Sequence, residues 1–229
     1  GDGLPSSSIP ALARDRAGHR WIATWDGLAR YDGVSFKVWR HDPLDPASLP
    51  GNVVQALHID ASDRIWVATE NGGLSVMDTD RRGFRHYRMA DHPRMGSDDV
   101  FAITSRGGDV WFGTFGGGLH RLAADGGITR FAAAAAGTEG LPSDNVLSLA
   151  FDAKGVLWVG TMGGLARYDG GRLRRLALPA GDGLIIYSVT ADADAMWVGA
   201  SDGVHRWSPD GHWVSPPWSP SVPRSRRPR

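Results

Sequence analysis

Five short loops in this sequence carry side chains that differ from one loop to the next, although the strings around them hardly change. Each loop follows a tryptophan-containing string that ends in Thr, or in Ala200 in the last case. The first residues of the loops are Trp25, Glu70, Phe115, Met162 and Ser201. Polar residues follow three of them, namely Asp26, Asn71 and Asp202. Aromatic surface beside carboxylates and amides suits a sugar or another polar small ligand.

A second set of polar residues lies in the segments that connect one repeat to the next. It contains Asn52, Asp98, Asp99 and Asn145, with Tyr187 as an aromatic member. Variable loops on a constant scaffold are typical of a binding face. From both sets we predict the ligand-binding residues Trp25, Asp26, Asn52, Glu70, Asn71, Asp98, Phe115, Asn145, Met162 and Asp202. The alternative is that these are turn residues at positions that tolerate many side chains.

Short strings that resemble catalytic or metal-binding motifs are explained by the repeat. Residues 199–203 match G-x-S-x-G, but a nucleophile elbow joins a strand to a helix, and this string is the fifth copy of a strand-to-strand turn. No Gly-Lys-Ser/Thr follows the glycines at 116–118, and the eight histidines contain no HExxH pair. Asp192 and Asp194 lack the further ligands and closing Glu of a calcium loop. We therefore predict no catalytic residue, no metal and no cofactor.

The strings that hold the loops recur at a nearly fixed period. Their tryptophans are 45, 45, 47 and 39 residues apart, at Trp21, Trp66, Trp111, Trp158 and Trp197. A fixed period of about 40–50 residues indicates one supersecondary unit that is stacked repeatedly. We expect all five tryptophans to occupy equivalent buried positions, so they are scaffold and not evidence of a binding site.

One repeat is predicted to contain four short strands. In the second repeat they fall at residues 54–59, 64–69, 74–77 and 83–89, and turns rich in Asp, Ser, Asn and Gly separate them. The 3.6-residue period of a helical solenoid is absent. Four strands in 40–50 residues is the size of a β-propeller blade. We therefore predict an all-β protein with a β-propeller of five four-stranded antiparallel blades, which is either a complete ring or an incomplete part of a larger propeller.

The predicted blades divide the chain into one repeat domain and a tail. The blades cover about residues 1–48, 49–94, 95–140, 141–183 and 184–217, and the Pro/Arg-rich residues 218–229 are expected to be unpacked. We expect an open arc or a strained ring, whose bare blade faces would favour self-association or the addition of further blades.

Composition excludes several classes of function. The chain has 25 basic and 25 acidic residues, so its net charge of zero favours neither nucleic acid nor an anionic membrane, and we predict no nucleic-acid partner. There is no apolar run of about 18 residues, so any membrane attachment is expected through segments outside this sequence. Residue 1 is Gly, which fits a processed protein or an excised piece of a longer one.

The repeat resembles the two-component regulator propeller repeat. Residues 141–146, 152–155, 157–161 and 163–165, followed by Tyr168 and Asp169, match nearly every element of its Leu-Pro-Ser, Asp-x-x-Gly, Leu-Trp-Val-Gly-Thr, Gly-Gly-Leu and Tyr-Asp pattern. The second repeat is almost as close, and the fifth is the weakest. The resemblance implies a periplasmic sensor region of a bacterial membrane receptor whose output module is a histidine kinase or a GGDEF-type diguanylate cyclase.

We therefore expect a non-catalytic, ligand-sensing propeller that takes part in signal transduction. Two alternatives remain open. Streptogramin lyases are propeller enzymes with similar Trp-containing repeats, but they resemble this chain less closely and need a histidine-bearing loop and a magnesium site. The third interpretation is a protein-interaction scaffold.

Overall fold

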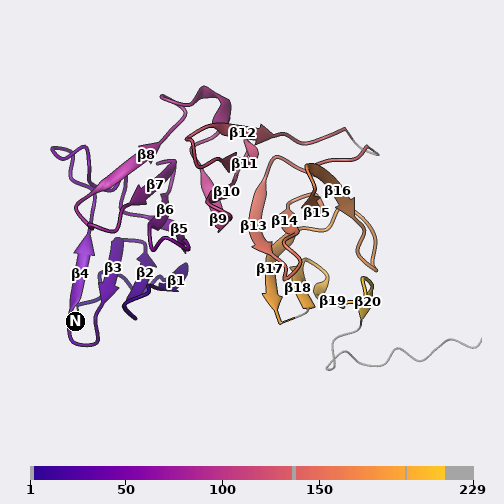
Figure 1. Ribbon diagram of the computed structural model, residues 1–229, viewed down its shortest axis with the longest axis horizontal. Helices are drawn as coiled ribbons and strands as arrows, with labels where there is room; N and C mark the ends of the chain where they lie inside the picture. The colour runs from indigo at the N-terminus through magenta and orange to yellow at the C-terminus, as the bar shows by residue number, and fades with distance from the viewer. Residues whose placement is uncertain (1–2, 136–137, 194, 215–229) are drawn as a thin grey trace, which may run out of the picture.

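Five four-stranded antiparallel sheets form an open arc in the computed structural model, which describes residues 3–135, 138–193 and 195–214 (Figure 1). Each sheet contains four strands that are consecutive in the sequence, so each sheet is one propeller blade. The prediction of an all-β propeller of five blades is confirmed. Helical structure in the described residues is limited to the 3₁₀ turn η1 (Pro93–Met95).

The innermost strand of each blade comes first in the sequence, and the outermost comes last. Blade one contains β1 (Ala11–Arg14), β2 (Arg20–Thr24), β3 (Gly27–Tyr31) and β4 (Phe36–Trp39), and blade two contains β5 (Val54–Ile59), β6 (Ile65–Thr69), β7 (Leu74–Met77) and β8 (Phe84–Tyr87). Blade three contains β9 (Val100–Arg106), β10 (Asp109–Thr114), β11 (Gly118–Leu122) and β12 (Ile128–Phe131). Blade four contains β13 (Val146–Phe151), β14 (Leu157–Thr161), β15 (Gly164–Asp169) and β16 (Arg172–Leu176), and blade five contains β17 (Ile186–Asp192), β18 (Ala195–Ala200), β19 (Gly203–Trp207) and β20 (Trp213–Val214).

The core consists of four apolar clusters, one between each pair of neighbouring blades. The repeat tryptophan of a blade packs against the next blade along the chain. Trp21 lies in a cluster with Val54 and Val67 of blade two, and Trp66 lies in one with Val100 and Phe112 of blade three. Trp111 and Trp158 do the same toward blades four and five. These four tryptophans are buried, as predicted.

Trp197 differs from the other four, and the expectation that it is buried is wrong. Its side chain is only half-buried. The physical reason is its position in the fifth blade, because no further blade among the described residues packs against the face that a repeat tryptophan uses. In the same blade Val204, on β19, is 46% exposed, whereas its counterpart Leu165 in blade four is 1% exposed.

The arc is open because the first and last blades do not pack together. The inner strands are in contact in sequence order, β1 with β5, β5 with β9, β9 with β13 and β13 with β17. Figure 1 shows the gap that β1 and β17 border. On the free side of blade one, Leu12 is 67% exposed. The tail predicted for residues 218–229 lies outside the described residues.

Close packing between blades depends on small residues in the second strand. A Cβ at Gly113, on β10, would collide with the side chain of Val146 at the start of β13. Gly160, on β14, meets Ile186 of blade five in the same way. Blades one and two have Ala23 and Ala68 at this position, and both are fully buried. The repeat therefore keeps Gly or Ala where neighbouring blades approach most closely.

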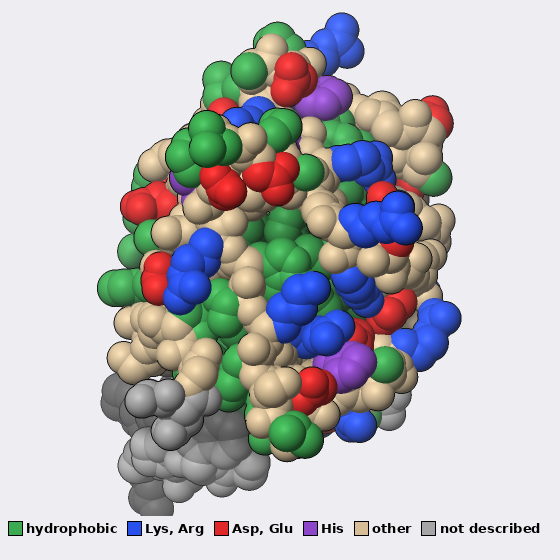
Figure 2. Space-filling model, turned by 90° about the vertical axis from the view of Figure 1, so that its left-hand side faces the viewer, with side chains coloured by type: hydrophobic (Ala, Val, Ile, Leu, Met, Phe, Trp, Pro, Cys, Tyr) green, Lys and Arg blue, Asp and Glu red, His purple; other side chains and the backbone are tan. Residues whose placement is uncertain are grey.

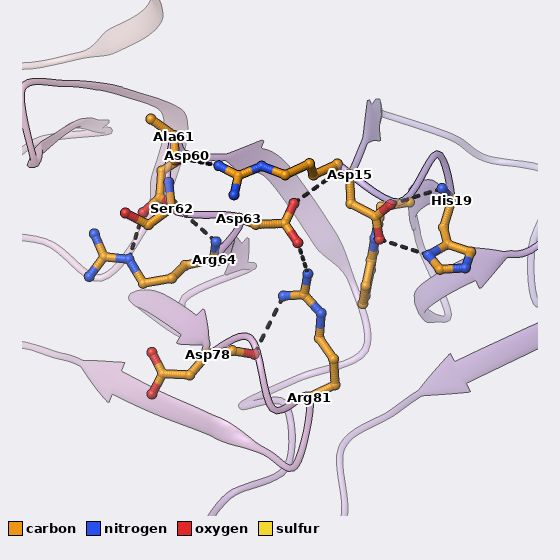
Figure 3. A network of polar contacts seen from close by, with 11 residues as sticks. Asp15, His19, Asp60, Ala61, Ser62, Asp63, Arg64, Asp78 and Arg81 are labelled. Carbon is orange, nitrogen blue, oxygen red and sulfur yellow. Dashed lines mark hydrogen bonds and ion pairs between the residues drawn. The ribbon is translucent and has the colours of Figure 1, made fainter.

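A network of polar contacts connects blades one and two at the loops between first and second strands (Figure 3). The Arg16 backbone N–H donates to Asp63 Oδ1 at 2.9 Å, and the Arg16 guanidinium donates to the Ala61 carbonyl at 2.6 Å. Asp63 also accepts a hydrogen bond from Arg81 Nη2 at 2.8 Å. This network joins three loops of two blades and is structural.

Candidate functional site

The turns between second and third strands lie with the inter-blade loops at one end of the blades, which we call the tip end. The first residue of each turn is the tip residue, and its backbone N–H donates to a carbonyl of the loop that precedes its own blade. The pairs are Trp25 to Ser8 (3.3 Å), Glu70 to Val53 (2.9 Å), Phe115 to Asp99 (2.8 Å), Met162 to Asn145 (3.0 Å) and Ser201 to Ile185 (2.9 Å). The backbone therefore holds all five tip residues in equivalent places, whatever their side chains.

In blades one, three and four the framework threonine before the tip closes the turn from inside. Thr24 Oγ1 donates to the Gly27 carbonyl at 2.7 Å, and Thr161 Oγ1 donates to the Gly164 carbonyl at 2.7 Å. Thr114 makes the same bond to Gly118 at 3.2 Å. These hydroxyls are buried, so the turn is fixed below the surface and the tip side chain is free to project from it.

Large apolar and aromatic side chains are exposed at the tip end. Trp25 is 59% exposed, Phe115 is 43% exposed and Met162 is 37% exposed. Glu70 is exposed as well, and its carboxylate has no hydrogen bond or ion pair with the residues that the structure describes. Contiguous exposed apolar surface is typical of a binding site, whereas singly exposed apolar side chains are ordinary.

The inner strands add further residues, of which sequence reasoning named only Tyr187. In blades two to five the first strand has a β-bulge near its start, which leaves one residue without a partner on the second strand. The bulged residues are Gln55, Phe101, Leu147 and Tyr187. Bulges re-aim side chains and are frequent next to functional sites. The sequence contained a signal for these positions, because each bulged residue directly precedes the small residue, Ala or Ser, that recurs in the first strand of every repeat.

These two sets of residues meet in a groove of about 530 Å³ at the tip end. Its lining includes the tip residues Trp25 and Glu70, the bulged residues Gln55 and Phe101, and Ile9. Phe115 lies beside it, with its ring centroid 6.0 Å from that of Phe101. This volume is within the range of about 300–1,000 Å³ that is usual for small-molecule sites. The structure thus brings together Trp25, Glu70 and Phe115 of the predicted set.

Two other predicted residues, Asn52 and Asp98, fasten neighbouring blades to each other. Asn52 Oδ1 accepts the His41 backbone N–H at 2.8 Å, and Asp98 Oδ1 accepts the Met89 backbone N–H at 2.7 Å. Their carbonyls accept the N–H of turn glycines of the preceding blade, at 2.7 and 2.8 Å. Asp144, before blade four, likewise accepts the Ala133 backbone N–H with its side chain and the N–H of turn glycines of blade three with its carbonyl. These side chains are used within the protein and do not line the groove.

The remaining predicted residues also lie away from the groove, and most have protein partners. Asp26 forms an ion pair with Arg40 at 3.1 Å, and Asp202 accepts from His205 at 2.9 Å. Asn145 Oδ1 accepts the Gly116 backbone N–H at 2.8 Å, and its Nδ2 donates to the sulfur of Met162 at 3.6 Å. Asn71 is an exposed turn residue with a positive φ of 51°.

Charge on the outside of the arc is mixed. Figure 2 shows the side that bears blades one and two, where Lys and Arg side chains lie among Asp, Glu and apolar side chains. In residues 3–135, 138–193 and 195–214 no group of three or more His, Asp or Glu side chains is placed to hold a metal ion. The same residues contain no helix that is long and apolar enough to cross a membrane.

The fold defines a β-propeller whose inner strands and turns line a groove of small-molecule size. Residues 48–71 and 140–163 match the family model described as two component regulator propeller. The chain therefore carries two-component regulator propeller repeats, as the resemblance of the second and fourth repeats predicted. A curated relative, histidine kinase P4 of Formosa agariphila, is 42% identical over 48 residues, which is 21% of this chain and 4% of that protein.

Solved structures with the same fold include extracellular domains of B. thetaiotaomicron signalling proteins. One belongs to a hybrid two-component system, with 21% identity, a TM-score of 0.66, and coverage of 90% of this chain and 34% of that chain. Another belongs to a one-component system, with 21% identity, a TM-score of 0.73, and coverage of 93% of this chain and 28% of that chain. Virginiamycin B lyase from Staphylococcus aureus also shares the fold, with 16% identity, a TM-score of 0.66, and coverage of 92% of this chain and 71% of the lyase chain. This chain thus spans about a third or less of the two solved extracellular domains and 4% of the histidine kinase relative.

Proposed function

We propose that this chain is a non-catalytic signal-input propeller that works outside the cytoplasmic membrane, in the periplasm, as part of a bacterial two-component receptor. The observation that carries the proposal is the tip-end groove, which variable residues line on a constant frame. The extracellular location given for the two B. thetaiotaomicron domains supports the placement. The histidine kinase relative favours a kinase over a diguanylate cyclase as the output module.

Ligand binding in the groove would act by population shift. A ligand changes an equilibrium only by its differential affinity for the two states. The groove is formed by the segment that precedes β1, by β5 and β9, and by the turns after β2 and β6. A ligand would therefore bridge two blade interfaces and favour one relative arrangement of these blades.

A thermal-shift screen of small molecules against the purified chain tests the proposal. A ligand at 100 times its dissociation constant adds about 2.7 kcal/mol to the free energy of unfolding. We expect at least one compound to do so, and the triple variant Trp25→Ala, Glu70→Ala, Phe115→Ala to lose the effect. The control is Arg172→Ala with Arg174→Ala, on the outer strand β16, where both side chains are exposed and far from the groove.

A screen in which nothing binds, or a triple variant that binds normally, would contradict the proposal. The same screen examines the lyase alternative, which the shared fold of virginiamycin B lyase keeps open. Conversion of any screened compound to a product would favour an enzyme over a sensor.

A further inference from the structure

The lining of the tip-end groove has one sign of charge. Glu70 is the one ionisable side chain among its described lining residues. A second carboxylate lies directly behind the lining, because Asp99 Oδ1 accepts a hydrogen bond from Gln55 Nε2 at 2.9 Å. No Lys, Arg or His of the described chain lines the groove to neutralise these two charges. The groove is therefore complementary to a positive charge.

The walls beside Glu70 are aromatic. Trp25 lines the groove from the β2–β3 turn, and Phe101 lines it from the bulge of β9. Phe115 extends the aromatic surface next to Phe101. The face of an aromatic ring attracts a cation, most strongly in the case of Trp, and the attraction grows when the cation is partly desolvated. A carboxylate flanked by aromatic rings thus offers a cation two kinds of favourable contact.

The lining has four kinds of side-chain polar group without a partner among the described residues, and only one of them is charged. They are the Glu70 carboxylate, the Ser8 hydroxyl, the Trp25 indole N–H and the Gln55 amide oxygen, whereas Gln55 Nε2 donates to Asp99. A sugar needs hydrogen bonds for several hydroxyls, and polar groups buried without a partner reduce affinity. An organic cation with an apolar body needs one charge partner and apolar contact, which this groove supplies.

We propose that the tip-end groove takes a small organic cation, namely an amine or quaternary ammonium with an aromatic or aliphatic body, and that Glu70 is its charge partner between the rings of Trp25 and Phe101. The inference rests on the proposed role of the groove as a ligand site. The backbone of the site is preorganised, because the N–H groups of Trp25 and Glu70 are fixed at 3.3 and 2.9 Å to the carbonyls of Ser8 and Val53. Little backbone ordering is then required on binding.

Calorimetric titration of the chain with three probes of the same shape tests this inference. The probes are 2-phenylethylammonium, neutral 2-phenylethanol and anionic 3-phenylpropionate. We expect the ammonium probe to bind at least about tenfold more tightly than the alcohol, and the anion to bind most weakly. We expect Glu70→Gln, which keeps the shape of the side chain, to remove this preference for the cation.

Glu139→Gln is the matched control, because Glu139 is the other glutamate of the chain and does not line the groove. It should leave all three affinities unchanged. Equal binding of the three probes, an unchanged preference in Glu70→Gln, or binding of a sugar such as maltose without the ammonium probe would overturn the inference. If the three probes bind equally, or if maltose binds alone, loss of that binding in Trp25→Ala would still show that the groove is a ligand site. The preference for a cation and the role of the groove as a ligand site can therefore fail separately.

Discussion

The carboxylate of Asp60 accepts a hydrogen bond from the indole N–H of Trp66, with 2.8 Å between Asp60 Oδ2 and Trp66 Nε1. The same bond joins Asp15 to Trp21 at 2.9 Å and Asp152 to Trp158 at 3.0 Å. The first Asp of the turn between the first and second strands therefore fixes the tryptophan whose ring fills the interface to the next blade. Figure 3 shows Asp60 and Asp15 within the polar network that connects the first two blades.

Replacing Asp60 should be costly. Besides Trp66, Asp60 accepts from the backbone N–H groups of Ser62 and Arg64 and from the Arg64 guanidinium. We expect Asp60→Ala to lower the free energy of unfolding by about 2–4 kcal/mol, because the buried Trp66 indole N–H and three partly buried donors lose their acceptor. Urea denaturation measures this. As a control, Asp80→Ala removes an exposed carboxylate that faces Arg82 at 3.8 Å and should change stability by less than about 0.5 kcal/mol. Equal effects in the two variants would show that the Asp60–Trp66 bond is unimportant.

Two framework threonines should respond oppositely to the same substitution. Thr161 Oγ1 donates to the Gly164 carbonyl and accepts the Gly163 N–H, whereas Thr69 Oγ1 is buried without a partner in the described structure. Thr161→Val should cost about 1–2 kcal/mol, and Thr69→Val should be neutral or stabilising, because a buried hydroxyl without a hydrogen bond is unfavourable. Chemical denaturation gives the free energy of unfolding of both variants. A clear loss of stability in Thr69→Val would contradict the prediction.

Stability should fall as the pH decreases from about 6.5 to 4. Burial disfavours the imidazolium form of His120 and lowers its pKa from 6.5 to about 4, although Nε2 contacts the Met95 carbonyl at 2.5 Å. Between these values the unfolded chain binds a proton that the folded chain does not, so unfolding is favoured as the pH drops. The full effect is about 3 kcal/mol. Denaturation at several pH values should give a shallower slope for His120→Gln than for the parent protein, and parallel slopes would exclude His120 as the cause.

The loss of stability below pH 4 should involve the carboxylates of the turns between first and second strands, such as that of Asp60. Burial tends to raise the pKa of Asp60, but the hydrogen bonds from Trp66 and Arg64 outweigh it and hold this pKa below its ordinary value of 3.8. The stability that Asp60 contributes is present above pH 3.8 and is lost as the pH falls through its folded-state pKa. We expect Asp60→Asn to have a flatter stability profile below pH 4. An Asp80→Asn control should follow the parent protein in this range.

Trp66→Ala and Trp197→Ala should differ in cost. Trp66 is 1% exposed between blades two and three, and its removal should cost about 3–5 kcal/mol. Trp197 is half-buried at the free face of blade five, so its removal should cost about 1–2 kcal/mol. Denaturant unfolding of both variants measures the two losses in free energy of unfolding. Equal losses would mean that another surface covers Trp197 in solution, and light scattering of the parent protein at increasing concentration would then show association.

The propeller could be predicted from the sequence because its determinants are local and repeated. Five tryptophan strings, regular turn residues and strands of alternating character specify the four-stranded blade without reference to distant contacts. The tip residues Trp25, Glu70 and Phe115 could be found for the same reason, since each follows a repeated string and the repeat alone marks it as variable.

Membership of the groove was decided only by the tertiary structure. Asn52 and Asp98 look like binding residues in the sequence, but they accept backbone N–H groups from the preceding blade's last loop. Phe101 looks like an ordinary strand residue, but a bulge turns its side chain toward the groove. The half-buried state of Trp197 likewise depends on the neighbours of blade five, because no following blade is present among the described residues. Local sequence determines backbone conformation within a blade, whereas side-chain direction and burial depend on the neighbouring blade, which a repeat pattern does not describe.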